Sequence, residues 1–143
     1  MKLSTGLRNG LLSGGSLKSL LDGGEIRIYD TVAVPASADD AIGGATLLVV
    51  IKNGGSGITF AAAAGGVMQK APGEVWSGVN AATGNALFYR HVLSADDGSA
   101  STAAVRIQGS VGLAGADMNL SSVALTGGAT QSLNFYSVAM PAG

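Results

Sequence analysis

The chain has 143 residues, a formal net charge of −1 and no cysteine, which excludes a disulfide-stapled domain and any thiol chemistry. Its eight Lys and Arg residues are scattered, which argues against a nucleic-acid-binding protein because such proteins carry a clustered basic patch. Only 12% of the residues are charged, about half of the roughly 25% usual for soluble domains, whereas 47% are apolar.

The composition favours small residues, since glycine occurs 23 times and alanine is also abundant. Small side chains bury little apolar area, and each Å² contributes only roughly 25 cal/mol. One domain of this length can form a core, but a lone monomer would have a thin one under a weakly charged surface. We therefore expect much of the surface to be buried against other subunits, because obligate interfaces are more apolar.

The only helical pattern in the chain covers residues 4–22. Ser4 or Thr5 can cap a first short helix and Ser16 a second one, because their hydroxyls accept from free amides of a first helical turn. Leucine spacings of three and four predict one apolar face, made of Leu7, Leu11, Leu12, Leu17, Leu20 and Leu21. Residues 1–24 are thus expected to be a helical cap on the domain of residues 25–143, or an arm that packs on a neighbouring subunit.

Four strands are predicted before residue 80. Residues 25–30 alternate and predict a half-buried strand, whereas residues 45–52 are apolar on both faces and predict a covered one. The turn residues 53–57 favour a hairpin that pairs residues 58–69 with that covered strand, although four alanines there also allow a helix. Residues 74–79 predict a short strand that carries the only tryptophan.

The stretch 84–113 is predicted to form two strands joined by an exposed polar loop at residues 96–98. Its first strand, residues 86–93, is apolar on both faces, which predicts a place in the middle of a sheet. The second, residues 105–113, alternates cleanly. We expect its polar side, with Arg106, Gln108 and Ser110, to face water or a partner.

A last pair of strands is predicted over residues 118–125 and 132–140, joined by glycines at 127 and 128. About eight strands with turn signals at regular intervals are typical of a sandwich, a jelly roll or a small barrel. We therefore expect an all-β fold, a single β-sandwich or jelly-roll-like domain with a short N-terminal helical segment.

Nothing in the sequence forms a recognisable catalytic or metal-binding motif. His91 is the only histidine, and the nearest acids in sequence are Asp96 and Asp97, so a structural role is favoured. The acidic pairs at 39–40 and 96–97 lack the regular spacing of calcium loops, and residues 53–57 lack the Lys-Ser/Thr of a phosphate loop. We expect no enzyme activity, no cofactor and no metal.

Leucine and aromatic side chains are the candidates for contact with a partner, with a place in the core as the alternative for the aromatic ones. The candidate interface residues are Leu7, Leu11, Leu17, Leu20, Trp76, Phe88, Tyr89, Phe135 and Tyr136. The apolar strands 45–52 and 86–93 are further candidates.

The opening MKLSTGLRNGLL, then SLKSLLDGGEIRIYD and PASADDA, resemble a family of small structural proteins of tailed phages and prophages. The resemblance continues in the same order through APGEVWSGV, ALFYRHVLSADDGS, VRIQGSVG and LSSVALTGGATQSLNFYSVAMP, and so covers nearly the whole chain. It implies a virion structural component and supplies no catalytic or ligand residue.

Resemblance and composition together predict a capsid-associated decoration or cement protein that binds the major capsid protein as a homo-oligomer, often a trimer among such proteins. A tail, collar or fibre-associated virion protein is the alternative, and a small host-envelope glycan-binding or hydrolytic module is a third. The expected location is the virion, after synthesis in the host cytoplasm, with no nucleic-acid or membrane partner. The longest apolar run, residues 47–51, is too short to span a bilayer, and glycines interrupt any signal-peptide core.

Overall fold

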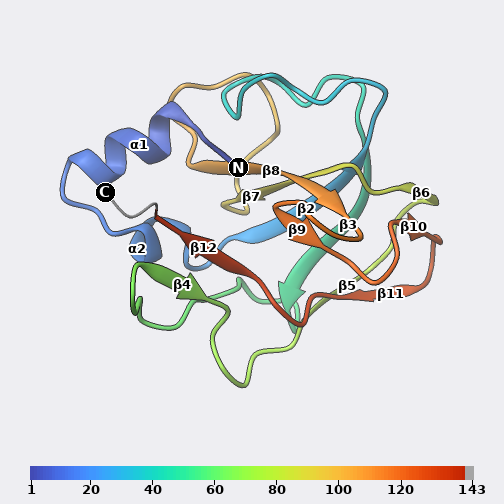
Figure 1. Ribbon diagram of the computed structural model, residues 1–143. Coiled ribbons are helices and arrows are strands. Elements are labelled where there is room, and N and C mark those ends of the chain that lie inside the picture. Colours follow the sequence, from blue (N-terminus) through green and yellow to red (C-terminus); the bar gives the residue numbers. More distant parts are fainter. Residues whose placement is uncertain (141–143) are drawn as a thin grey trace.

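The computed structural model describes residues 1–140 and consists of one large sheet, faced by a layer of shorter strands and two helices (Figure 1). The large sheet has the order β1-β8-β7-β2-β3-β5-β11, with β9 added in parallel to β8. Its strands are β1 (Lys2–Leu3), β2 (Glu25–Asp30), β3 (Thr46–Asn53), β5 (Trp76–Val79), β7 (Phe88–Val92), β8 (Arg106–Gly112), β9 (Met118–Asn119) and β11 (Thr130–Ser132). The remaining strands form two pairs, β6 (Gly84–Asn85) with β10 (Ala124–Leu125) and β4 (Val67–Gln69) with β12 (Ser137–Ala139). The predicted all-β, sandwich-like fold class with a short helical segment is confirmed.

Two short helices follow β1, namely α1 (Thr5–Leu12) and α2 (Leu17–Leu21). The Ser4 hydroxyl caps α1 by accepting from the amide of Leu7 at 3.1 Å, and it also accepts from the amide of Arg106 at 2.9 Å. Ser16 caps α2 in a capping box. Leu7 and Leu21 are fully buried, so both helices pack against their own chain.

One side of the sheet, the core face, is covered by the second layer. Register and burial place these residues on it: Ile26, Ile28, Val49, Ile51, Tyr89, His91 and Ile107. Phe60, Trp76, Leu133 and Tyr136 belong to the same hydrophobic cluster. Strand β7 lies between β2 and β8 with all five residues buried, which confirms its predicted place in the middle of a sheet.

The opposite side, the back face, is rich in polar and charged side chains. Residues that pair across antiparallel strands share a face, as do alternate residues along one strand. The pairings Glu25–Val92–Arg106, Arg27–Arg90–Gln108 and Lys52–Ser77 therefore place all these residues on the back face. Val50 and Val79 share it through the same register, and alternation along the chain places Val75, two residues before Ser77, on the same side.

The expectation that Arg106 and Gln108 face water is wrong, since Arg106 is only 1% exposed and Gln108 only 2%. Residues 31–45 and 93–105 lie over this part of the back face and accept hydrogen bonds from it. Ser110, at the far end of the same strand, is exposed as expected. The alternating pattern correctly predicted a strand, but two loops of the chain, and not water, cover most of its polar side.

Two predicted strand pairings are also wrong. Residues 118–125 and 132–140 do not pair with each other, because β10 pairs with β6 and β12 with β4. Residues 58–69 do not form a hairpin with β3, which pairs with β2 and β5 instead, and the alanines at 61–64 are not helical. Leu133 and Phe135 would share one face of a regular strand over residues 132–140, yet Leu133 is 2% and Phe135 68% exposed.

Candidate functional site

The nine predicted contact residues separate into three groups by exposure. Fully or almost fully buried are Leu7, Trp76, Phe88, Tyr89 and Tyr136. Partly buried and packed against the core are Leu11, Leu17 and Leu20. Phe135 alone of the nine is exposed, at 68%. The buried aromatic residues therefore have the core role that the sequence left open, and Phe135 offers the largest free surface of the nine.

Residues 31–45, which we call the strap, are held over β7 and β8 by an unusual series of contacts. From residue 35 to residue 38 every main-chain carbonyl oxygen accepts a hydrogen bond from one long side chain. The donors, in that order, are Gln108 at 2.7 Å, Lys2 at 2.7 Å, Arg90 at 3.2 Å and Arg106 at 3.2 Å. The exposed Lys2 and the three buried donors Gln108, Arg90 and Arg106 thus satisfy backbone groups that a loop would otherwise expose to water.

Arg106 has the most complete set of partners in this layer. It forms a two-point ion pair with Asp96, at 2.5 Å from Nε to Oδ2 and 3.0 Å from Nη2 to Oδ1, and also donates to the carbonyl of Ser99 at 2.8 Å. The Asp96 side chain is only 5% exposed and Gly98 is buried, so the expectation of an exposed loop at residues 96–98 holds only for Asp97. The acidic side chain turns inward because the buried guanidinium requires a counter-charge.

Two other charged residues of the back face, Arg90 and Glu25, differ in whether they form ion pairs. Arg90 makes no ion pair within residues 1–140, and burial together with the nearby charge of Arg106 lowers its pKa. Burial alone would raise the pKa of Glu25, but hydrogen bonds from Arg27 and Lys52 lower it overall. Those two ion pairs measure 2.7 and 3.0 Å. The layer is therefore held by strong polar contacts beneath the strap and beside it.

The acidic pairs act as local structure-forming groups. Asp39 accepts from both the amide and the hydroxyl of Thr5, at 2.8 and 2.6 Å, and these bonds lower its pKa. Asp40 accepts from the amide of Ser37, and Asp97 from the amide of Ser99. Within residues 1–140 no group of three or more His, Cys, Asp or Glu side chains could hold a metal ion.

His91 lies on the core face, fully buried beneath α2. Its Nε2 donates to the carbonyl of Leu21 at 3.2 Å, and its ring stacks on Phe60 at 5.5 Å between centroids. Burial lowers the pKa of His91 to about 4, so the ring is neutral near pH 7. Asp96 lies with Arg106 on the back face and not beside His91, which agrees with a structural role for the histidine.

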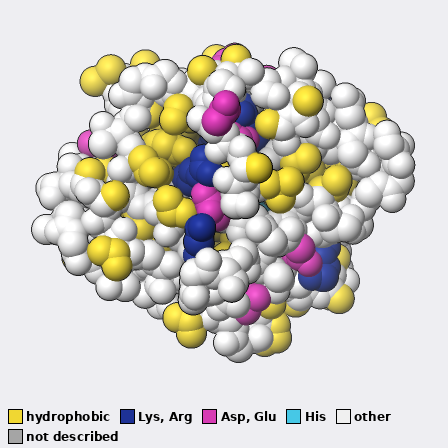
Figure 2. All heavy atoms as spheres, turned by 180° about the vertical axis from the view of Figure 1, so that it is seen from behind, with side chains coloured by type: hydrophobic (Ala, Val, Ile, Leu, Met, Phe, Trp, Pro, Cys, Tyr) yellow, Lys and Arg dark blue, Asp and Glu magenta, His cyan; other side chains and the backbone are white. Residues whose placement is uncertain are grey.

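The back face is uncovered over β5, in contrast to its covered part over β7 and β8. Val75 and Val79 are 67% and 64% exposed, and the partly buried Val50 lies on the same side. Seen from behind, Lys/Arg and Asp/Glu side chains gather near the middle of the molecule with apolar side chains on both sides (Figure 2). We call Val50, Val75 and Val79, with Lys52 beside them, the valine face.

The position of Val75 on the valine face could have been predicted from the sequence, although the aromatic residues were the stronger contact candidates. Residues 74–79 were predicted to be a strand, and alternation around the buried Trp76 puts Val75 on the opposite side. Trp76, the contact candidate predicted in this strand, is instead 1% exposed.

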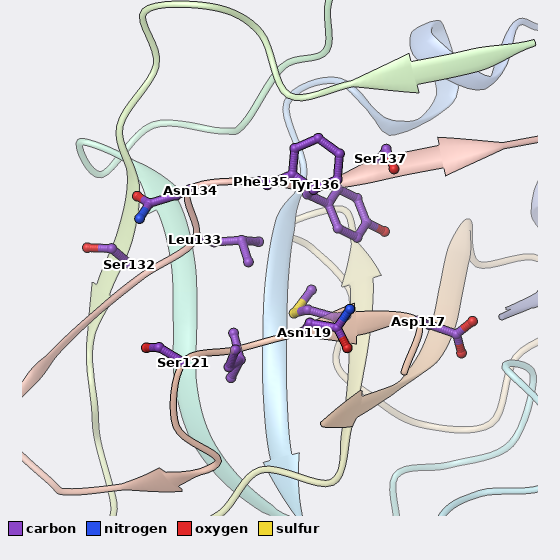
Figure 3. Close-up of a pocket in the computed structure, with 11 residues that line it drawn as sticks. Asp117, Asn119, Ser121, Ser132, Leu133, Asn134, Phe135, Tyr136 and Ser137 are labelled. Atoms are coloured by element: carbon purple, nitrogen blue, oxygen red, sulfur yellow. The ribbon is translucent and has the colours of Figure 1, made fainter. Parts of the chain in front are cut away.

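A cleft of about 440 Å³ opens between residues 117–121 and 132–137 (Figure 3). Its floor is apolar and closed, formed by Met118, Leu120, Leu133 and Tyr136, which are 2–6% exposed. Its rim carries the exposed neutral side chains of Asn119, Ser121, Ser132, Asn134 and Phe135, and Asp117 is the one charged residue in the lining. The two segments approach from opposite sides of the cleft and are not paired with each other.

Comparisons with protein-family models, curated proteins and solved structures each find no match to this chain. Among residues 1–140, no helix has the length and apolar character needed to cross a membrane. The function must therefore be inferred from the geometry of the valine face and the cleft.

Proposed function

We propose that the chain is a bacteriophage virion structural protein that decorates the capsid and binds the major capsid protein through its valine face. The observation that carries this proposal is the pair of valines, Val75 and Val79, left uncovered on one side of a sheet whose neighbouring part is closed by the strap. The resemblance to phage structural proteins supports the same role.

The energetics of the valine face suit a contact surface. Complete burial of one valine stabilises by about 1.5–3 kcal/mol, so the two exposed valines provide apolar contacts on either side of the Lys52–Ser77 pair, which lies between them. Lys52 and Arg27 already share the carboxylate of Glu25, so a partner can cover this face without leaving a new charge unpaired. A partner can therefore pack on the two valines while Lys52, between them, keeps its ion pair with Glu25.

Self-association is part of the same proposal. Met1, Val34 and Leu87 are 43–49% exposed and line a separate hollow of about 160 Å³. This hollow is the candidate contact between copies, which leaves the valine face for the capsid.

Lysine substitutions on the valine face should abolish binding to phage heads. The wild-type chain should cosediment stoichiometrically with empty heads built from the major capsid protein of the phage that encodes it, and should raise their thermal stability. The double variant Val75→Lys, Val79→Lys should bind about 100-fold more weakly or worse, because it removes two buried valines and introduces charge. The matched control is Val32→Lys, since Val32 is fully exposed at 108% and lies in the strap.

Binding of the control like the wild type, with loss in the double variant, would support the proposal. Equal binding by all three proteins would remove the valine face from the contact. Binding to isolated tails and not to heads would favour the tail or collar alternative.

A further inference from the structure

The cleft between residues 117–121 and 132–137 has a chemistry unlike that of the valine face. Its rim carries two carboxamides and two hydroxyls, from Asn119, Asn134, Ser121 and Ser132, and one exposed aromatic ring, Phe135, on the segment opposite Asn119 and Ser121 (Figure 3). Carboxamides and hydroxyls both donate and accept hydrogen bonds without carrying charge. A ligand suited to this rim is itself neutral and rich in hydroxyl or amide groups.

The charges around the cleft support the same conclusion. No Lys, Arg or His is among the residues that line it, so it offers no cation for an acidic ligand. The one carboxylate, Asp117, is already occupied, with Oδ1 2.8 Å from the N-terminal amine and Oδ2 accepting from the amide of Ser110 at 2.9 Å. A cationic ligand would therefore compete with two existing contacts.

Phe135 supplies the apolar element of the site. Its ring is 68% exposed, although the chain on either side of it is anchored by the buried Leu133 and Tyr136. Tyr136 donates to the hydroxyl of Tyr89 at 3.2 Å, and Leu133 donates its amide to the carbonyl of Trp76 at 2.8 Å. The exposed ring is thus presented by a fixed backbone, which lowers the entropy cost of binding a flat apolar surface against it.

The closed floor disfavours an extended peptide as the ligand and favours a ligand that lies on the rim. An extended peptide inserted between the two segments would direct alternate side chains downward and would need open apolar pockets to receive them. Met118, Leu120, Leu133 and Tyr136 already fill that space and are at most 6% exposed. A ligand that rests on Phe135 and bonds to the rim needs no such pockets.

We infer that this cleft binds a neutral saccharide, with one sugar ring packed on Phe135 and its hydroxyls bonded to Asn119, Asn134 and the rim serines. A sugar ring has a C–H-rich face for the aromatic ring and hydroxyls at its edge for the amides. The Asn119 Oδ1 accepts from the amide of Ala116 at 3.2 Å, which orients the side chain and leaves its Nδ2 to donate to the ligand. At about 440 Å³ the cleft lies within the roughly 300–1,000 Å³ range of small-molecule sites. This binding would act beside the proposed capsid contact and is independent of it.

The test is an NMR titration of the ¹⁵N-labelled full chain with three neutral probes, cellotetraose, maltotetraose and tri-N-acetylchitotriose. At least one probe should bind saturably with a Kd of about 1 mM or tighter, with the largest shifts at residues 117–121 and 132–137. Phe135→Ala and Asn134→Ala should each weaken that binding at least about tenfold. The control Leu12→Ala changes an 86% exposed side chain on α1 and should bind like the wild type.

The inference is overturned if no probe binds, if binding survives Phe135→Ala unchanged, or if an extended Ser/Asn-rich peptide binds the cleft in preference to every saccharide. The same Phe135→Ala protein should still bind phage heads. Loss of saccharide binding with retained head binding separates this inference from the proposed function.

Discussion

Replacing Arg106 by methionine is expected to lower the free energy of unfolding by about 3–5 kcal/mol, because it leaves the buried carboxylate of Asp96 without its partner. The residue is 1% exposed and donates to Asp96 as well as to the carbonyls of Ala38 and Ser99. The variant therefore loses an ion pair and also loosens both loops that cover the back face. Urea unfolding followed by circular dichroism measures the loss.

A double-mutant cycle shows whether the unpaired charge is the cause. Asp96→Asn in the Arg106→Met background should recover part of the lost stability, because the amide is cheaper to bury than a lone carboxylate. Arg8→Met is the matched control, since Arg8 is exposed on α1 and should change stability by no more than about 0.5 kcal/mol. An Arg106→Met protein as stable as this control would contradict the proposed structure of the layer.

Between pH 7 and pH 4 the protein is expected to lose about 3 kcal/mol of stability through His91 alone. Burial lowers its folded-state pKa from 6.5 to about 4, so the unfolded state binds the proton first as the pH falls. The stabilisation is therefore present above pH 6.5, decreases between pH 6.5 and 4, and changes no further below the folded-state pKa. The estimate follows from about 1.4 kcal/mol per pKa unit.

Comparison with His91→Gln isolates this contribution from the carboxylates that titrate in the same range. Unfolding free energies of both proteins at pH 7, 5.5 and 4 should show a steeper fall for the wild type, and the gap between the proteins should narrow by about 3 kcal/mol. Parallel curves would mean that His91 is accessible to protons in the folded state.

Local features of the fold could be predicted from the sequence because each depends on neighbouring residues. The caps at Ser4 and Ser16 are set within one helical turn, and the doubly apolar residues 86–93 required a covered strand. Strand partners could not be predicted in the same way. Gly127 and Gly128 signalled a turn, yet β10 before them pairs with residues 84–85 and β11 after them with residues 77–79, far away in sequence.

Which side chains are exposed could be predicted less well from the sequence, since exposure depends on what the loops cover. The polar side of β8 resembled a solvated face, but Arg106 and Gln108 are buried because the strap and residues 93–105 cover them and accept their hydrogen bonds. The large aromatic residues were natural candidates for an interface, but the thin core uses Trp76, Tyr89 and Tyr136 itself. The exposed apolar side chains include valines and Phe135 instead.

Locating the chain on the phage particle tests the proposed function most directly. Virions that carry a labelled copy, imaged by cryo-electron microscopy, should show it on the outer surface of the head, at a fixed number per capsid subunit and with the valine face toward the shell. Density for the label on the tail alone, or virions that contain none of the protein, would contradict the assignment as a capsid decoration protein.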